Sequence, residues 1–290
     1  MATEKLVDFI KEPGITRELL GPRNKLILVI GGPDTGKTTL IECIADLLAE
    51  HQEVGVVDLD MGQSHIGMPT TIAWGKIKGV FKDWSDIRTE DFYFTGTLSP
   101  PGNLVPALVG AKLITEKALF FCQKVIVDTT GLIAEPAGRV LKQYKIDILS
   151  PDIILALERA KELGHILDCY TLQKFPLVYR LSVPMQVELK SITGRAQYRA
   201  LRFKSYFTNA RTYEVSYKDM GIRFTREPIQ FSTSELKDTV VSFRDVRNRD
   251  LALGIVEGLN IRHKKLEVLS PINPDVKFST LLFGITKITL

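Results

Sequence analysis

The sequence predicts an α/β protein in which a doubly wound, mostly parallel sheet is followed by a smaller, mainly β domain. Three observations lead there: apolar runs without alternation, helical patterns between them, and a change to short β-type segments after about residue 210. Strands that alternate with helices form right-handed βαβ units, which build parallel sheets covered on both faces. We therefore expect an N-terminal segment over 1–24, an α/β domain over 25–209 and a β-rich domain over 210–290.

Apolar runs identify the buried strands, because a strand covered on both faces is apolar throughout. These runs cover 25–31, 54–57, 125–127 and 153–157. Apolar residues at helical spacing predict helices over 38–50 and 104–121 and near 159–169. Beyond residue 210, segments such as 239–243 and 281–290 are rich in Val, Phe, Thr and Ile, and turn residues such as Gly221 separate them.

Composition excludes disordered, fibrous and membrane-spanning proteins. The chain has 290 residues, 38 Lys+Arg against 34 Asp+Glu, a net charge of +4 and 44% hydrophobic residues, as ordinary globular proteins do. No apolar run approaches the roughly 18 residues that a transmembrane helix needs, so we expect no membrane contact. Cys43, Cys122 and Cys169 are dispersed, which favours reduced thiols and a cytoplasmic location.

A glycine-rich turn follows the first apolar run. Residues 31–38 read Gly-Gly-Pro-Asp-Thr-Gly-Lys-Thr and fit the phosphate-loop pattern G-x-x-x-x-G-K-[ST] between a strand and a helix. The backbone N–H groups of such a loop and the positive end of the helix bind phosphate. Lys37 is expected to bridge the β- and γ-phosphates, and the Thr38 hydroxyl to bind Mg²⁺. The residues predicted to bind the nucleotide are Gly32, Pro33, Asp34, Thr35, Gly36, Lys37, Thr38 and Thr39.

Acidic residues follow the next two apolar runs. Asp58 and Asp60 are two positions apart, so both carboxylates can face the phosphate loop from an extended chain. One of them could bind Mg²⁺ while the other accepts a proton from an attacking hydroxyl. Asp128 offers a further carboxylate for a metal-bound water. The predicted metal ligands are Thr38, Asp60 and Asp128.

Positive charge is concentrated between residues 190 and 211. This stretch holds six basic residues and no acidic one, namely Lys190, Arg195, Arg199, Arg202, Lys204 and Arg211. Its charge of +6 leaves the rest of the chain at −2, because 4 − 6 = −2. Arg195, Arg199 and Arg202 share one helical face, which suits a lid whose guanidinium groups clamp phosphoryl oxygens.

Together these motifs resemble the polynucleotide 5′-hydroxyl kinase family, which includes a kinase of the pre-mRNA 3′-end cleavage machinery and a ribosomal-RNA-processing relative. The family motif D-x-D-x-G-Q is met by Asp58, Asp60, Gly62 and Gln63. Residues 94–100 are similar to its Phe-x-Gly…Ser/Thr-Pro loop, and 129–132 to its clasp, T-x-G followed by a large residue. Its lid pattern R-x-x-x-R is matched by Arg195 and Arg199. The resemblance covers about residues 25–210 and suggests a minimal, prokaryote-like member.

The resemblance implies transfer of the γ-phosphate of ATP to the 5′-hydroxyl end of RNA, DNA or both, with Mg²⁺ as cofactor. The catalytic residues would be Lys37, Asp58, Asp60, Arg195 and Arg199. The polynucleotide would contact Gln63, Ser99, Pro100, Asn103, Thr129, Thr130, Gly131 and Leu132. Family members often have tryptophan where Leu132 stands. A leucine there makes apolar contact in place of base stacking.

Two other functions remain open at this point. Residues 128–131, Asp-Thr-Thr-Gly, have the D-x-x-G form with which GTPases sense a γ-phosphate. No Asn-Lys-x-Asp follows, since residues 157–160 read Leu-Glu-Arg-Ala, and this favours adenine over guanine nucleotides. The first alternative is a dimer-gated nucleotide switch, a GTPase or ATPase that uses Asp128 and Gly131 as sensors. The second is a binding module that holds a nucleotide structurally.

Overall fold

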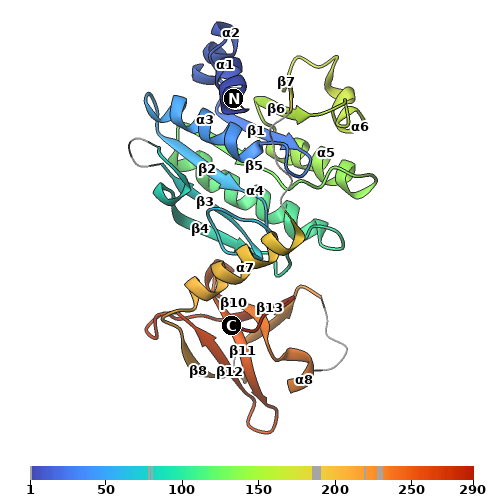
Figure 1. Ribbon diagram of the computed structural model, residues 1–290. Coiled ribbons are helices and arrows are strands. Elements are labelled where there is room, and N and C mark those ends of the chain that lie inside the picture. The colour runs from blue at the N-terminus through green and yellow to red at the C-terminus, as the bar shows by residue number, and fades with distance from the viewer. Residues whose placement is uncertain (1, 78, 80, 185–190, 219, 227–230) are drawn as a thin grey trace.

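The computed structural model describes residues 2–77, 79, 81–184, 191–218, 220–226 and 231–290. Two sheets build the molecule, one above the other in Figure 1, with the N-terminus at the top and the C-terminus in the lower sheet. Among the described residues, none of the helices has the length and apolarity that crossing a membrane requires.

The central sheet has seven strands in the order β4-β3-β2-β5-β1-β6-β7. Their bounds are β1 (Leu26–Gly31), β2 (Val54–Asp58), β3 (Thr71–Lys76), β4 (Arg88–Phe94), β5 (Lys124–Asp128), β6 (Ile153–Glu158) and β7 (Leu177–Ser182). Strands β2, β5, β1, β6 and β7 pair in parallel, while β3 and β4 extend one side antiparallel. The carboxyl ends of β1, β2 and β5 therefore meet at one edge, here called the carboxyl edge.

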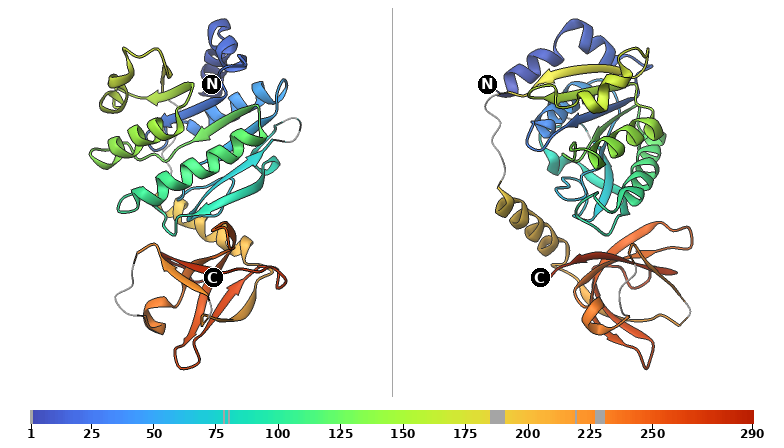
Figure 2. Two further views of the ribbon diagram at one scale, coloured as in Figure 1. Left: turned by 180° about the vertical axis from the view of Figure 1, so that it is seen from behind. Right: turned by 90° about the vertical axis from the view of Figure 1, so that its right-hand side faces the viewer.

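Helices cover both faces of this sheet (Figure 2). One face carries α1 (Ala2–Ile10), α2 (Pro13–Leu20) and α3 (Lys37–Ala49), and the other carries α4 (Leu104–Phe121) and α5 (Ala137–Leu149). Successive residues of a strand point to opposite faces. Ile27 and Val29 accordingly pack in the α1–α3 core, whereas Leu28 and Ile30 pack in the α4–α5 core. The short helices α6 (Gly164–Leu167), η1 (Trp84–Asp86) and η2 (Asp168–Tyr170) complete this part.

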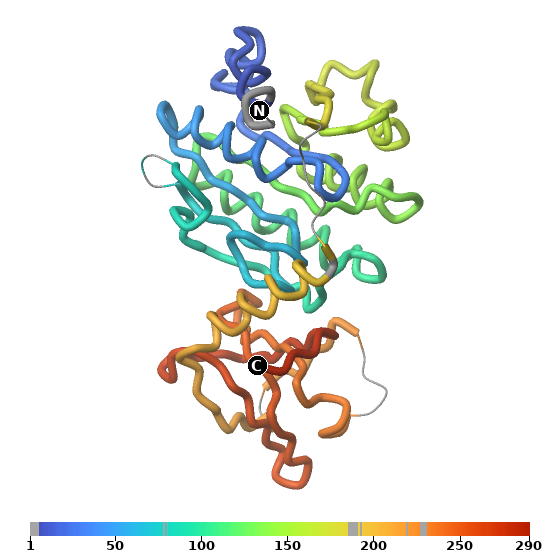
Figure 3. Tube along the Cα trace, viewed as in Figure 1, coloured from blue at the N-terminus to red at the C-terminus, as the bar shows by residue number. Residues whose placement is uncertain are grey.

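The C-terminal sheet has six strands in the order β8-β12-β11-β10-β13-β9. Their bounds, with those of one short helix, are β8 (Arg211–Ser216), β9 (Gly221–Phe224), α8 (Thr233–Leu236), β10 (Thr239–Arg244), β11 (Asp250–Asn260), β12 (Lys265–Ser270) and β13 (Thr280–Lys287). All neighbours are antiparallel except β13 and β9. One of its faces packs against Phe203 of α7 (Ile192–Tyr206) and against Phe207, the residue that follows this helix, so α7 lies between the two sheets (Figure 3).

The predicted fold class is confirmed, and the predicted strands lie within a residue or two of the observed ones at most ends. Gly221, expected in a turn, is the first residue of β9. Helices α1 and α2 and the antiparallel pair β3–β4 were not predicted. We propose 25–209 and 210–290 as the two domains, although α7 packs against the second one.

Candidate active site

The phosphate loop connects β1 to α3 as the sequence predicts, and together with the first turn of α3 it holds all eight residues predicted to bind the nucleotide. Asp34 and Gly36 have positive φ angles of 50° and 89°, which curl the backbone toward the start of α3. A Cβ on Gly31 would lie 2.6 Å from Thr35 Oγ1, so the loop needs glycine there. The Thr35 hydroxyl donates to the Gly32 carbonyl at 3.1 Å and fixes the turn.

Lys37 begins α3 and is nearly buried in the loop. Its ammonium donates to the carbonyl oxygen of Gly32 at 2.7 Å. Thr38 and Thr39 follow in the first turn and are half-buried. The first turn of a helix has unsatisfied N–H groups and a positive dipole end, so this arrangement favours a phosphate group.

Asp58, at the end of β2, is fully buried and anchors the loop that follows it. Both of its oxygens accept hydrogen bonds: Oδ1 from Asp60 N (2.9 Å), and Oδ2 from Ser64 Oγ (2.9 Å), His65 N (2.6 Å) and Ile66 N (3.3 Å). Burial raises the pKa of Asp58. With its oxygens committed to these donors, Asp58 is suited to hold the loop rather than to take a proton from a substrate.

Asp60 and Asp128 present the other two carboxylates at the carboxyl edge. Asp60 Oδ1 accepts from the N–H groups of Gly62 and Gln63, each at 3.0 Å, and no described residue donates to Oδ2. Asp128 lies beside Asp58 in register on neighbouring parallel strands. Burial, with the nearby Asp58 carboxylate, raises the pKa of Asp128 to about 7. Its Oδ1 is buried and has no hydrogen-bond partner within the described part of the chain.

The sequence did not point to two buried lysines of α5. Lys142 and Lys145 are both fully buried. Lys142 donates to Thr129 Oγ1 at 2.7 Å and to the Thr130 carbonyl at 2.6 Å. Burial, with Lys145 and Lys37 nearby, lowers the pKa of Lys142 well below its ordinary value, and burial lowers that of Lys145 to about 8. The sequence feature that could have identified them is a pair of lysines at positions i and i+3 on an otherwise apolar helix face.

The clasp, residues 129–132, is held from both sides. The Thr129 hydroxyl donates to the Val29 carbonyl at 2.8 Å and accepts from Lys142. A Cβ on Gly131 would lie 2.8 Å from Pro33 N, so only glycine lets the clasp approach the phosphate loop. Leu132 is half-buried and packs on the α4–α5 core.

Helix α7 is the predicted lid, and it lies across the loop that carries Asp60. Arg195 pairs with Asp34 at 2.6 Å, Tyr198 donates to Ser64 O at 2.8 Å, and Arg202 donates to Gly67 O. Gln63 in turn donates to Arg195 O at 3.2 Å. Arg199 is half-exposed and makes no hydrogen bond or ion pair with any residue that the structure describes. Lys190 lies outside the described residues.

The predicted acceptor loop links β4 to α4. Ser99 is exposed, Pro100 is buried, and Asn103 is the residue before α4. Asn103 N donates to Pro100 O at 2.7 Å, which closes the turn. A Cβ on Gly62 would lie 2.6 Å from Leu98 O, so this loop touches the one that carries Asp60 and Gln63.

The side chains at this edge fit a magnesium ion bound together with phosphate. Among the described residues, no group of three His, Cys, Asp or Glu side chains forms a metal site by itself. Mg²⁺ on a nucleotide needs only one or two protein ligands besides phosphate oxygens and water. Thr38 and Asp128 supply a hydroxyl and a carboxylate, and the buried, unpartnered Oδ1 of Asp128 suits a cation.

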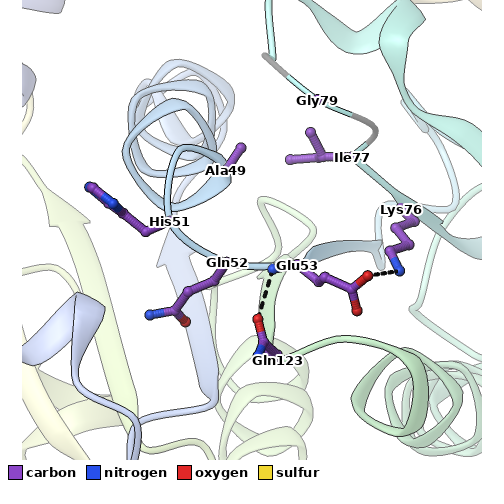
Figure 4. Close-up of a pocket in the computed structure, with 8 residues that line it drawn as sticks. All are labelled: Ala49, His51, Gln52, Glu53, Lys76, Ile77, Gly79 and Gln123. Carbon is purple, nitrogen blue, oxygen red and sulfur yellow. Dashed lines mark hydrogen bonds and ion pairs between the residues drawn. The ribbon is translucent and has the colours of Figure 1, made fainter.

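A cavity of about 540 Å³ lies at the opposite edge of the sheet, where β2 and β5 begin (Figure 4). Lys76 pairs with Glu53 at 2.8 Å, and Gln123 Oε1 accepts from Glu53 N at 3.0 Å. None of the predicted site residues lines this cavity. The carboxyl edge therefore holds the candidate site.

Residues 31–209 match the family model described as mRNA cleavage and polyadenylation factor CLP1 P-loop. The chain belongs to this family. The matched region runs from the phosphate loop through the lid and covers more than half of the chain. Membership of the CLP1 P-loop family confirms the resemblance drawn from the motifs.

Curated relatives extend the similarity. The chain is 28% identical over 309 residues to the polyribonucleotide 5′-hydroxyl-kinase of Pyrococcus abyssi, covering 89% of this chain and 86% of that protein. Identity to the Pyrococcus horikoshii enzyme of the same name is 31% over 78% of this chain and 62% of that protein. For the Methanocaldococcus jannaschii enzyme it is 35%, over 69% of this chain and 55% of that protein. The last two matches thus span less than two thirds of those relatives.

A solved structure supports the fold of both sheets. The structure titled wild-type Clp1p–Pcf11p (454–563) complex matches 98% of this chain and 78% of that chain, with a TM-score of 0.73 and 13% identity. At that identity the likeness concerns the fold alone. It covers the C-terminal sheet as well as the region of the family model.

Proposed function

We propose that this protein is an ATP-dependent polynucleotide 5′-hydroxyl kinase. One observation carries the proposal: the lid helix spans the phosphate loop and the Asp60 loop at one sheet edge, through Arg195–Asp34 and Gln63–Arg195. A kinase needs its phosphate donor, its proton acceptor and its closing cations together. The names of the relatives, polyribonucleotide 5′-hydroxyl-kinases, agree with this arrangement and favour RNA as the acceptor.

The nucleotide is bound by the phosphate loop. Lys37 leaves the Gly32 carbonyl and bridges the β- and γ-phosphates, and the N–H groups at the start of α3 bind the β-phosphate. Thr38 and Asp128 hold Mg²⁺, which, when bound, supplies positive charge beside the phosphates. Asp60 was also predicted as a metal ligand. Since Oδ1 of Asp60 is bound by Gly62 and Gln63, we assign its other oxygen to the acceptor.

In the proposed transfer, one bond to the γ-phosphorus forms and one breaks. Asp60 Oδ2 accepts the proton of the 5′-hydroxyl while that oxygen bonds to the γ-phosphorus. The bond from the γ-phosphorus to the bridging oxygen breaks, and ADP leaves with the electron pair. Arg199, and Arg195 once it releases Asp34, neutralise charge on the transferring group and exclude water under the lid. Asp58 holds the loop that positions Asp60.

The acceptor polynucleotide lies between the two loops and the clasp. Gln63, Ser99, Pro100 and Asn103 border it on one side, and Thr129, Thr130, Gly131 and Leu132 on the other. The Thr130 hydroxyl is buried without a hydrogen-bond partner in the described structure, which suits a donor or acceptor on the substrate. The cytoplasmic location stays a prediction.

The test is transfer of labelled γ-phosphate to matched 5′-hydroxyl RNA and DNA oligonucleotides. We expect labelled 5′ ends with ATP, and a loss of at least about 10³-fold in Lys37→Ala, which lacks the charge at the β- and γ-phosphates. ATP hydrolysis without any labelled end would contradict the proposal. GTP preference with dimerisation on a non-hydrolysable analogue would instead support the nucleotide switch.

A further inference from the structure

The C-terminal sheet makes a close backbone contact with the acceptor loop. Gly284 of β13 and Gly96, which follows β4, meet so closely that a Cβ on Gly284 would lie 2.6 Å from Gly96 O and 2.7 Å from Gly96 Cα. The Gly96 carbonyl accepts from Ile285 N at 2.8 Å, Thr286 N at 3.2 Å and Thr286 Oγ1 at 3.3 Å. Three donors from β13 thus fix one carbonyl of the loop that leads to Ser99.

A second contact holds the start of the same loop. Asp250, the first residue of β11, accepts from Phe94 N at 2.9 Å. Arg244 binds the Asp250 carboxylate through Nε at 2.7 Å and Nη2 at 2.9 Å, and all these groups are buried. The C-terminal sheet abuts the β4 side of the central sheet in both views of Figure 2. The loop is therefore held at Phe94 and again two residues later.

From Gly96 the contacts continue to the carboxyl edge. Thr95 N and Gly96 N donate to the Thr70 carbonyl at 2.9 and 3.2 Å, and Thr70 N donates to Met61 O at 2.8 Å. Met61 directly follows Asp60. A displacement of Gly96 would thus be passed to both loops that border the proposed acceptor site, whereas the phosphate loop makes none of these contacts.

We propose that the C-terminal sheet positions the acceptor site, with Gly284 and Thr286 as positioning residues that act on Gly96. This inference rests on the proposed kinase function and assigns a role to residues beyond the family model, which ends at 209. The C-terminal sheet holds in place the two loops that border the proposed acceptor site, whereas the nucleotide site forms within the central sheet. Positioning errors near 1 Å can cost about 10²-fold in rate, so such a support has a measurable effect.

Gly284→Ala tests the proposal in the full chain, with Gly258→Ala as matched control. Both variants add one methyl group to a C-terminal strand. At Gly284 it meets the backbone of Gly96, but at Gly258 it meets the Glu267 side chain, and the close contact there is with the carboxylate end, which can move. We expect Gly284→Ala to raise KM for a 5′-hydroxyl oligonucleotide about tenfold and KM for ATP less than about twofold. Gly258→Ala should match wild type in both.

Hydrogen exchange of the backbone amides at 95–99 provides a readout that does not depend on activity. It should become faster in Gly284→Ala and stay unchanged in Gly258→Ala. Unchanged exchange and unchanged KM values in folded Gly284→Ala would overturn the proposal, as would equal rises of both KM values. If Gly284→Ala does not fold, a second pair of variants tests the same contact. Thr286→Val removes the hydroxyl that donates to Gly96 O without adding bulk, and Thr286→Ser keeps a hydroxyl there. A rise in KM for the oligonucleotide in Thr286→Val but not in Thr286→Ser supports the proposal, and equal KM values in the two variants overturn it. If the wild-type protein transfers no phosphate, the kinase function is contradicted. The hydrogen-exchange comparison of Gly284→Ala with wild type still tests whether β13 holds the loop at Gly96.

Discussion

The two edges of the central sheet both bury lysine, but the neighbours of that lysine differ. At the opposite edge, Lys124 begins β5 and donates to the carbonyls of Gly21 (2.6 Å) and Asn24 (2.5 Å). At the carboxyl edge, Lys142 holds the clasp, and Lys145 lies among the charges of Asp60, Asp128 and Asp58. Burial lowers the pKa of both Lys124 and Lys145 to about 8.

The comparison shows that a lowered lysine pKa does not by itself identify a functional site. At the opposite edge the ammonium holds the turn at 21–24 against the start of β5, which is a structural role. At the carboxyl edge buried cations stand near buried carboxylates, and it is this combination that marks functional sites. Variants of the carboxyl-edge groups that face the substrate or hold the clasp should therefore change activity, whereas variants at the opposite edge should change stability alone.

A large effect at the carboxyl edge is expected for Arg199→Ala. If Arg199 neutralises charge on the transferring phosphoryl group, kcat should fall roughly 10³-fold. Thermal unfolding should not change, because Arg199 bonds to no described residue. Lys204→Ala, an exposed basic residue of the same helix, is the control and should leave kcat unchanged. A loss no larger than about threefold in Arg199→Ala would make Arg199 a surface residue.

Substitutions of the two aspartates of the D-x-D-x-G-Q motif should have different effects. Asp60→Asn should lower kcat by about 10²- to 10⁴-fold because the proton acceptor is lost, while the amide oxygen still accepts from Gly62 and Gln63. Asp58→Asn should instead lower the free energy of unfolding by about 1–3 kcal/mol, since one amide cannot accept from all of its donors. Circular dichroism melting and kcat measure the two effects. Loss of transfer in Asp58→Asn at an unchanged Tm would identify Asp58 as the base.

Lys142→Met and Lys124→Met compare the two edges directly. Lys142→Met should raise KM for the oligonucleotide several-fold, because the Thr130 carbonyl loses its donor and the clasp shifts. Lys124→Met should leave both KM values unchanged and lower the free energy of unfolding by about 1–3 kcal/mol, as one buried and one partly buried carbonyl lose a donor. Steady-state kinetics and urea unfolding give these values. Equal KM effects in the two variants would refute the distinction between the edges.

The smallest expected effect is on how the free energy of unfolding depends on pH. The pKa of Lys145 is about 8 in the folded protein against an ordinary 10.5. Between these values the unfolded chain binds the additional proton, so the free energy of unfolding should rise with pH across this window. Lys145→Met should show less of this rise than wild type in urea unfolding at pH 7, 8, 9 and 10, roughly the span of the two values. Parallel curves for both proteins would show that Lys145 does not titrate there.

Local sequence predicted the parts of the site that depend on neighbouring residues. The phosphate loop, the acidic strand ends and the lid helix each follow from spacing within a few residues, and the structure brings them to one sheet edge. The burial of β1 on both faces of the sheet likewise follows from its uninterrupted apolar run. These features were predictable because backbone geometry at short range determines them.

Contacts between distant segments were not predictable in this way. The bonds of Lys142 to Thr129 and Thr130 depend on how α5 packs beside β5, and the pair Arg195–Asp34 joins residues 161 positions apart. Sequence left the base undecided between Asp58 and Asp60, since the donors to Asp58 come from the folded loop. The same holds for Gly284, whose role depends on a contact with Gly96 across two sheets.

The ion pair between Arg195 and Asp34 has a consequence for salt dependence. An entering triphosphate would exchange one anionic partner of Arg195 for another, so Arg195 gains little new charge pairing when the lid closes. Added salt weakens both pairings of Arg195 alike, and this contact should add little salt dependence to nucleotide binding. Polynucleotide binding displaces counterions from the phosphate backbone and should weaken steeply as salt rises. Ionic strength would therefore separate the two binding events of the kinase.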